Sequence, residues 1–185
     1  CTSIVDAVDG ALRIRNYGWE PNGYSFYLDD VSLTEVLPDP ETPVDPEPVD
    51  PNEIVVNGNF NDAENITWVT NEAPVEIVDI DGNNVLHVYN RYNGYLPARY
   101  HFDINAGVTY KVSFKIMYNE DKGEAVAPDT LTMEADVIDQ AISGDSNQRV
   151  HANNNEPAKT MTLTKGEWLT VEFECTAIID AEDGS

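Results

Sequence analysis

The sequence predicts an all-β fold, a two-sheet β-sandwich assembled from a permuted pair of tandem-module fragments. Two observations predict the sandwich. Many short segments alternate apolar and polar residues between turn-forming residues, and no window keeps a helical period beyond one turn. Short strands at regular spacing are typical of antiparallel sheets packed face to face. A third observation, an internal duplication, predicts the permutation.

The duplication relates residues 1–10 to residues 175–184. Seven of the ten paired residues are identical, at an offset of 174 residues, which suits a whole domain rather than a solenoid repeat. We therefore interpret the chain as a window across two copies of one module. Residues 1–36 are then the C-terminal strands of a first copy, 37–52 an acidic, proline-rich linker, and 53–185 the N-terminal bulk of a second copy, completed by strands of the 11–36 type.

Strand alternation recurs along the chain on both sides of the linker. The linker itself has six prolines, five acidic residues and no basic residue between Pro38 and Pro51, which predicts an extended, polyproline-like segment. Residues 81–84 predict a hairpin turn. The expected strands cover residues 12–17, 25–35, 54–60, 75–80, 85–90, 110–118, 130–137, 160–164 and 168–179.

Composition excludes several classes of partner. The 34 acidic residues against 10 basic ones give a net charge of −24, which repels nucleic-acid phosphate and anionic membranes. No apolar run reaches the ~18 residues of a membrane helix. We expect neither nucleic-acid binding nor membrane insertion. Cys175 lies on the apolar side of its alternating segment, and Cys1 is its duplicate, so we expect a buried thiol rather than a disulfide.

One carboxylate stands out in the segment 26–33. Strand alternation places Asp29 on the same face as Val31 and Leu33, among core side chains. A buried carboxylate without a partner costs several kcal/mol, so Asp29 needs one. Backbone amides and a hard cation such as calcium are both suitable, and the pattern leaves the two open.

Five segments together resemble the carbohydrate-binding modules of families four, nine and twenty-two. The match covers residues 53–179 and 12–33 once the permutation is undone. Residues 26–33 resemble the closing strand of these modules. The other matching segments are Val56-Asn57-Gly58-Asn59-Phe60 followed by Trp68, Arg91-Tyr92-Asn93-Gly94-Tyr95-Leu96-Pro97, Gly107-Val108-Thr109-Tyr110-Lys111-Val112-Ser113-Phe114, and Gly166-Glu167-Trp168.

The resemblance implies a β-jelly roll whose concave sheet binds β-glycans. It also implies a structural calcium ion near the first and last strands, with Asp29 as a ligand and Asp30 assisting. The family usually has Glu just after the phenylalanine of the first strand, and Asn61 occupies that position here. We therefore expect calcium to bind through Asp29, Asp30 and Asn61, more weakly or more through carbonyl oxygens than is usual.

Sugar chemistry and the resemblance together suggest which residues bind. An aromatic ring covers the apolar face of a pyranose, and arginine, asparagine and carboxylate groups bind its hydroxyls. Tyr95 matches the family's platform aromatic. Trp68 and Trp168 are interpreted as structural. The expected carbohydrate-binding residues are Tyr95, Arg91, Tyr92, Tyr89, Asn16, Tyr17, Trp19 and Glu134, with Asp136 beside Glu134 on the non-core side of its strand, where simple solvation is the alternative for both.

The function expected from these features is non-catalytic. The sequence lacks a serine-hydrolase elbow, a zinc-protease motif and a phosphate-binding loop, and no pair of its acids is marked as catalytic. We expect binding of a β-linked plant polysaccharide, foremost xylan, in a bacterial secreted or cell-surface protein. The catalytic partner would be an endo-xylanase-type glycoside hydrolase domain of the same parent chain. The alternative is a structural or adhesive spacer domain without glycan binding.

The permutation carries one structural expectation. Strands of residues 11–36 should complete the sandwich of residues 53–185, either within one chain or by strand exchange with a neighbouring chain, and the linker reaches far enough for both. The two copies of the duplicated segment compete for one place, so one of them should lie outside the core.

Overall fold

The computed structural model confirms an all-β protein. It describes residues 10–16, 24–36, 52–70, 73–91, 96–119, 128–139 and 159–177. Across these ranges there are nine strands, arranged in two antiparallel sheets, and no helix. Accordingly, the described ranges hold no helix of the length and apolarity that crossing a membrane requires.

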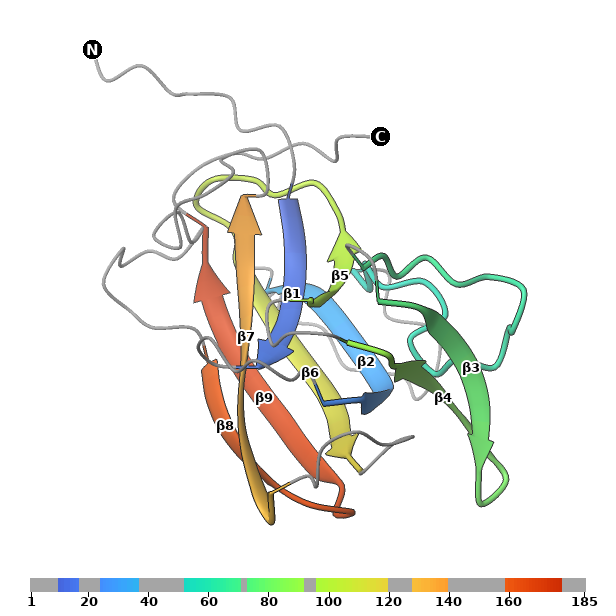
Figure 1. The fold of residues 1–185 in the computed structure, drawn as a ribbon. Helices are drawn as coiled ribbons and strands as arrows, with labels where there is room; N and C mark the ends of the chain where they lie inside the picture. The colour runs from blue at the N-terminus through green and yellow to red at the C-terminus, as the bar shows by residue number, and fades with distance from the viewer. Residues whose placement is uncertain are drawn as a thin grey trace, which may run out of the picture.

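The two sheets pack face to face, and the β3–β4 hairpin lies at the opposite side of the molecule from β8 and β9 (Figure 1). The four-stranded sheet has the order β5-β1-β7-β8, with β1 at Gly10–Asn16, β5 at Ala98–His101, β7 at Thr130–Asp139 and β8 at Lys159–Thr164. The five-stranded sheet has the order β3-β4-β2-β6-β9, with β2 at Phe26–Val36, β3 at Val75–Ile80, β4 at Asn83–Val88, β6 at Thr109–Tyr118 and β9 at Leu169–Thr176.

Both strands from the N-terminal part of the chain are central. Strand β1 pairs with β5 and β7, and β2 pairs with β4 and β6. The described part of residues 11–36 thus completes both sheets. The permuted tandem origin and the domain boundaries stay predictions. Of the duplicated segments, residues 1–9 and 178–184 lie outside the described residues, so which copy lies outside the core stays a prediction too.

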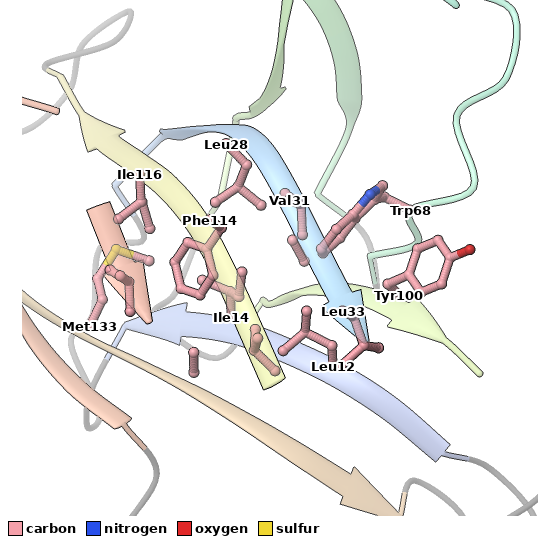
Figure 2. Close-up of a cluster of buried hydrophobic side chains, with 14 of the residues drawn as sticks. Leu12, Ile14, Leu28, Val31, Leu33, Trp68, Tyr100, Phe114, Ile116 and Met133 are labelled. Atoms are coloured by element: carbon pink, nitrogen blue, oxygen red, sulfur yellow. The ribbon is translucent and has the colours of Figure 1, made fainter. Parts of the chain in front are cut away.

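A mixed aliphatic and aromatic core fills the space between the sheets (Figure 2). Leu12 and Ile14 project into it from β1, and Phe114 and Ile116 from β6. Trp68 packs against Tyr100, with ring centroids 5.6 Å apart, which confirms a structural role for Trp68. Trp168 is different, since 39% of it is exposed, and its structural role stays a prediction.

Two expectations about strands were wrong. Residues 54–60 form no strand: Glu53 makes an isolated bridge to Thr34, and the chain then turns at residues 56–59. Side-chain alternation alone could not show this, because Asn57 and Phe60 adopt positive φ values of 56° and 54°. Conversely, strand β5 was not expected, because its residues are mostly buried whether apolar or polar and so lack alternation.

The hairpin expected around residues 81–84 is present with a tighter turn. Strands β3 and β4 are joined by Asp81 and Gly82 alone. Their φ values are 56° and 85°, and such positive values at both central residues are typical of the hairpin turns whose twist matches that of the strands.

The face expected for Asp29 was wrong because β2 contains a bulge. The pairing of β2 with β6 shifts register between Asp29 and Ser32, where Asp30 adopts a φ of 46°. An extra residue in one strand reverses which side chains face the core. Leu28 and Val31 therefore both belong to the core, while Asp29 lies on the outer face of the five-stranded sheet, although it is buried there.

Cys175 is buried, as the alternation in its strand predicts. It is a free thiol in β9, and burial raises its pKa to about 12. A thiol with so high a pKa is a poor nucleophile at neutral pH, so its role is packing.

Candidate functional site

The outer face of the four-stranded sheet carries charged side chains on three neighbouring strands. In β1, Leu12 and Ile14 enter the core, so Arg13 and Arg15 project to the opposite side. In β7 the same alternation places Glu134 and Asp136 on that side. We call the set Arg13, Arg15, Arg99, Glu134 and Asp136 the charged face.

Two ion pairs join β1 to β7 on the charged face. The Nε and Nη2 atoms of Arg13 donate to the two carboxylate oxygens of Asp136 at 2.9 and 2.6 Å. Arg15 pairs with Glu134 directly across the two strands, with its Nε and Nη2 atoms both 2.5 Å from the single carboxylate oxygen Oε1. Both carboxylates are buried, whereas each arginine side chain keeps 12% of its surface exposed. Ion pairs with two hydrogen bonds fix the planes of the guanidinium groups.

Arg99 extends this charged face onto β5, where its Cα is paired with that of Arg13. The face thus combines three guanidinium groups with two carboxylates. In a chain with only 10 basic residues, this is a local concentration of positive charge. Glu134 and Asp136 are buried in ion pairs, so they do not fit the alternative of simply solvated carboxylates.

Arg91, which precedes the segment that carries the expected tyrosines, is buried and makes several contacts. Its Nε donates to the carbonyl oxygen of Leu96 at 2.7 Å, so the two residues that flank 92–95 in sequence are bonded to each other. Its Nη1 donates to the Tyr24 carbonyl at 2.7 Å and to the Asn16 side-chain oxygen, and its guanidinium lies 4.9 Å from the centre of the Phe26 ring. Burial lowers the pKa of Arg91 to about 9, so the group is still a cation at neutral pH.

Arg91 and Asn16 are therefore in contact with each other, but both are buried. Burial to this degree favours an internal structural role for both over direct contact with a sugar. The segment 92–95 leads directly into β5 at the edge of the four-stranded sheet. The remaining expected residues Tyr17, Trp19, Tyr92 and Tyr95 lie outside the described residues.

Tyr89 lies on a different face of the molecule. Its ring stacks on His87, with centroids 4.8 Å apart, and His87 stacks on Tyr27 at 4.5 Å. His87 also contacts Glu76 on β3, with 3.0 Å between Nδ1 and Oε1. This row of rings crosses the outer face of the five-stranded sheet. The structure thus separates Tyr89 from Glu134, which lies on the opposite sheet.

The residues expected to bind calcium are only partly brought together. Asp29 accepts a hydrogen bond from the Asn83 amide at 2.7 Å, and its second carboxylate oxygen is buried without a hydrogen-bond partner. Asp30 instead pairs with Lys115 at 2.6 Å on the surface. Asn61 is exposed, directly after Phe60. Within the described ranges, no group of three or more His, Cys, Asp or Glu side chains is placed to hold a metal.

Sequence reasoning missed the arginines of the charged face. Their signal was present, because Leu12-Arg13-Ile14-Arg15 alternates as a strand with one charged side. What the alternation could not show is that β7, more than 100 residues later, supplies a carboxylate opposite each of these two arginines.

Comparison with known proteins places the chain in a family. A family model described as a carbohydrate binding domain, covering families 4 and 9, matches residues 52–183. The search of curated proteins found no match. Nor did any solved structure match.

Proposed function

The chain belongs to the family of carbohydrate-binding domains, and on that premise we propose that its charged face, together with the tyrosines of residues 92–95, binds a β-linked plant polysaccharide, foremost xylan. The observation that carries the proposal is the pair of fixed ion pairs, Arg13 with Asp136 and Arg15 with Glu134. They hold two guanidinium groups, with 12% of each arginine side chain exposed, on β1, which pairs with the strand β5 that follows residues 92–95 in sequence.

The charges of this face suit a sugar chain. Hydrogen bonds from a guanidinium to a hydroxyl oxygen are stronger than bonds between neutral groups. Because Asp136 and Glu134 already orient Arg13 and Arg15, little side-chain entropy is lost when a sugar binds. Glu134 thus acts through Arg15, as a positioning residue.

In this proposal the tyrosines of residues 92–95 supply the aromatic surface on which a sugar ring stacks. A tyrosine ring covers the C–H face of a pyranose, while the neighbouring charged groups bind its equatorial hydroxyls. Arg91 and Asn16 support this arrangement, because Arg91 bonds both the Asn16 side chain and the carbonyl of Leu96, the residue that follows 92–95 in sequence.

In this proposal the domain directs a secreted or cell-surface bacterial glycoside hydrolase, of the endo-xylanase type, to its substrate. Binding by several such modules on one parent chain would raise the effective affinity without new contacts. The module itself is non-catalytic, as a carbohydrate-binding domain is.

Calcium binding belongs to the same proposal, with Asp29 as the principal ligand. Its buried, unpartnered carboxylate oxygen is the feature that supports a cation there, since calcium prefers carboxylate and carbonyl oxygens. Asn83 offers a further side-chain oxygen next to it. Asp30 and Asn61 are less suited in this conformation, because Asp30 is paired with Lys115 and Asn61 is exposed.

Affinity electrophoresis through gels containing soluble xylan, β-glucan or mannan tests the proposal. We expect retardation by xylan, weakened at least tenfold by Tyr95→Ala and by Arg15→Ala. The matched control is Tyr89→Ala, which removes the same type of side chain from the other sheet and should leave retardation unchanged.

Two outcomes would count against this assignment. Retardation by none of the three glycans favours a structural spacer. Retardation lost in Tyr89→Ala but kept in Tyr95→Ala would move the binding site to the outer face of the five-stranded sheet, where Tyr89 stacks on His87.

A further inference from the structure

The carboxylates of the charged face are less accessible than its guanidinium groups. The side chain of Asp136 is fully buried, and that of Glu134 is 4% exposed. The side chains of Arg13 and Arg15, which pair with them, are each 12% exposed. A ligand that reaches this face therefore meets guanidinium groups first. Their N–H groups donate and never accept, so they select ligand oxygens, and they bind charged oxygens most strongly.

Arg99 brings a third guanidinium group next to that of Arg13. Ala98 and Tyr100 belong to the core, so Arg99 between them projects from the outer face of β5. The backbone amide of Arg99 donates to the Val69 carbonyl, and its carbonyl accepts from the Val69 amide, both at 2.9 Å. Arg99 and Arg13 are thus a non-hydrogen-bonded pair of β5 and β1, the type in which facing side chains lie closer. Like charges in this position destabilise a sheet.

The acids of the four-stranded sheet do not balance these arginines. Both oxygens of Asp136 bond Arg13, and Glu134 bonds Arg15. Elsewhere on the outer face of the described strands β1, β5, β7 and β8, the side chains are threonine, alanine, isoleucine and His101, with no further acid. Three arginines against two carboxylates leave one positive charge on this face, with histidine counted as neutral, in a chain whose net charge is −24.

From these observations we propose that the ligand of the charged face carries a carboxylate of its own, and that it is a xylan with glucuronic acid side groups. The uronate carboxylate lies between Arg13 and Arg99, where it offsets the repulsion of the two guanidinium groups. The inference rests on the proposed function, because it names the class of xylan that the same face binds.

Arg13 has donors for such a ligand. Two of its five N–H groups bond Asp136, through Nε and Nη2, so the edge of the guanidinium that bears Nη1 is directed away from that carboxylate. A second carboxylate can take two parallel bonds from a guanidinium edge, a geometry that a single sugar hydroxyl does not offer.

The net charge of the chain does not exclude an anionic glycan. The Debye length is about 8 Å at physiological ionic strength, so acids on distant surfaces are largely screened. The charges of the face itself therefore decide whether a uronate is attracted at contact distance.

Reduction of the uronate carboxyl group tests the proposal. Calorimetric titration compares a xylo-oligosaccharide that bears one glucuronic acid branch with the same molecule after reduction of that carboxylate to a neutral alcohol. We expect the acidic form to bind about tenfold more tightly, the effect of one hydrogen bond to a charged group. Both titrations are done at physiological ionic strength.

Two variants locate the carboxylate. Arg99→Met keeps an unbranched aliphatic side chain without the charge, and it should bring the ratio of the two affinities close to one. The matched control is Lys111→Met, which removes the same charge from an exposed position on β6 of the other sheet and should keep the ratio. Thermal unfolding of each variant checks that it is folded.

Each contrary outcome has a distinct meaning. Equal affinities for the two oligosaccharides overturn this inference and leave xylan binding standing, whereas binding of neither overturns both. A ratio that persists in folded Arg99→Met shows that the carboxylate is not held by Arg99. Because the comparison of the two ligands needs no variant, it decides the question even if Arg99→Met does not fold.

Discussion

Arg13 and Asp136 face each other across β1 and β7 and are joined by two hydrogen bonds, of 2.9 and 2.6 Å. They lie 123 residues apart in sequence. Asp136 is fully buried, although its side chain lies on the side of the sheet that faces away from the core. This pair therefore ties the N-terminal strand β1 to the body of the domain and also orients a guanidinium on the candidate sugar-binding face.

Breaking this pair from the carboxylate side should destabilise the domain strongly. Asp136→Ala leaves the Arg13 guanidinium mostly buried without its partner, and such a change costs about 3–5 kcal/mol. The double variant Arg13→Met/Asp136→Leu should recover most of that loss, because apolar replacement of a whole buried pair is often neutral. Urea unfolding followed by fluorescence measures both. If the double variant is as unstable as the single one, the pair is not the source of the effect.

Gly58 should not tolerate a side chain. A Cβ at this position would lie 1.9 Å from the carbonyl oxygen of Val31, whose amide donates to the Gly58 carbonyl at 2.9 Å. Gly58→Ala therefore forces the backbone apart at the β2 bulge, and we expect a loss of about 1–3 kcal/mol in unfolding free energy. The control is Gly82→Asn, at a positive φ with open space around it, where asparagine is a preferred turn residue. A smaller loss for Gly58→Ala than for Gly82→Asn would contradict this packing.

Alkaline pH should destabilise the fold through Cys175. Burial raises the pKa of this thiol from 9.0 to about 12, so the folded state keeps the proton where the unfolded state releases it. The contribution of the neutral thiol is complete below pH 9 and is lost between pH 9 and about 12, up to about 4 kcal/mol. Unfolding free energies of the unmodified chain and of Cys175→Ala, measured against pH, should converge over this window. Parallel curves would show that the thiol does not titrate in this way.

Calcium should raise the melting temperature, and Asp29 should be required for it. A cation that binds only the folded state stabilises it by about 2.7 kcal/mol at a hundred times its dissociation constant. We expect thermal unfolding in calcium, compared with unfolding in a chelator, to show an increase that Asp29→Ala abolishes. Asp30→Ala removes the exposed carboxylate that pairs with Lys115 and should retain the increase. Loss of the increase in Asp30→Ala alone would place the cation elsewhere.

Much of this fold follows from local sequence. Alternation in residues 110–118 and 130–137 determined which side chains of β6 and β7 enter the core, because successive residues of a strand point to opposite sides. The turn residues around Gly82 predicted the β3–β4 hairpin in the same way, and the chain's family was recognisable from five short segments.

Other features depended on residues that are distant in sequence. The bulge at Asp29 places that carboxylate on the outer face of the sheet. No local sequence pattern predicts the bulge, because it requires the positive φ of Asp30 and the approach of Gly58 to Val31. The order of the strands decided that Tyr89 and Glu134 lie on opposite faces. Sequence by itself determined the class of fold and the residue types available for binding a sugar. The tertiary structure alone decided which charges meet, because pairing between strands is set by packing across the whole domain.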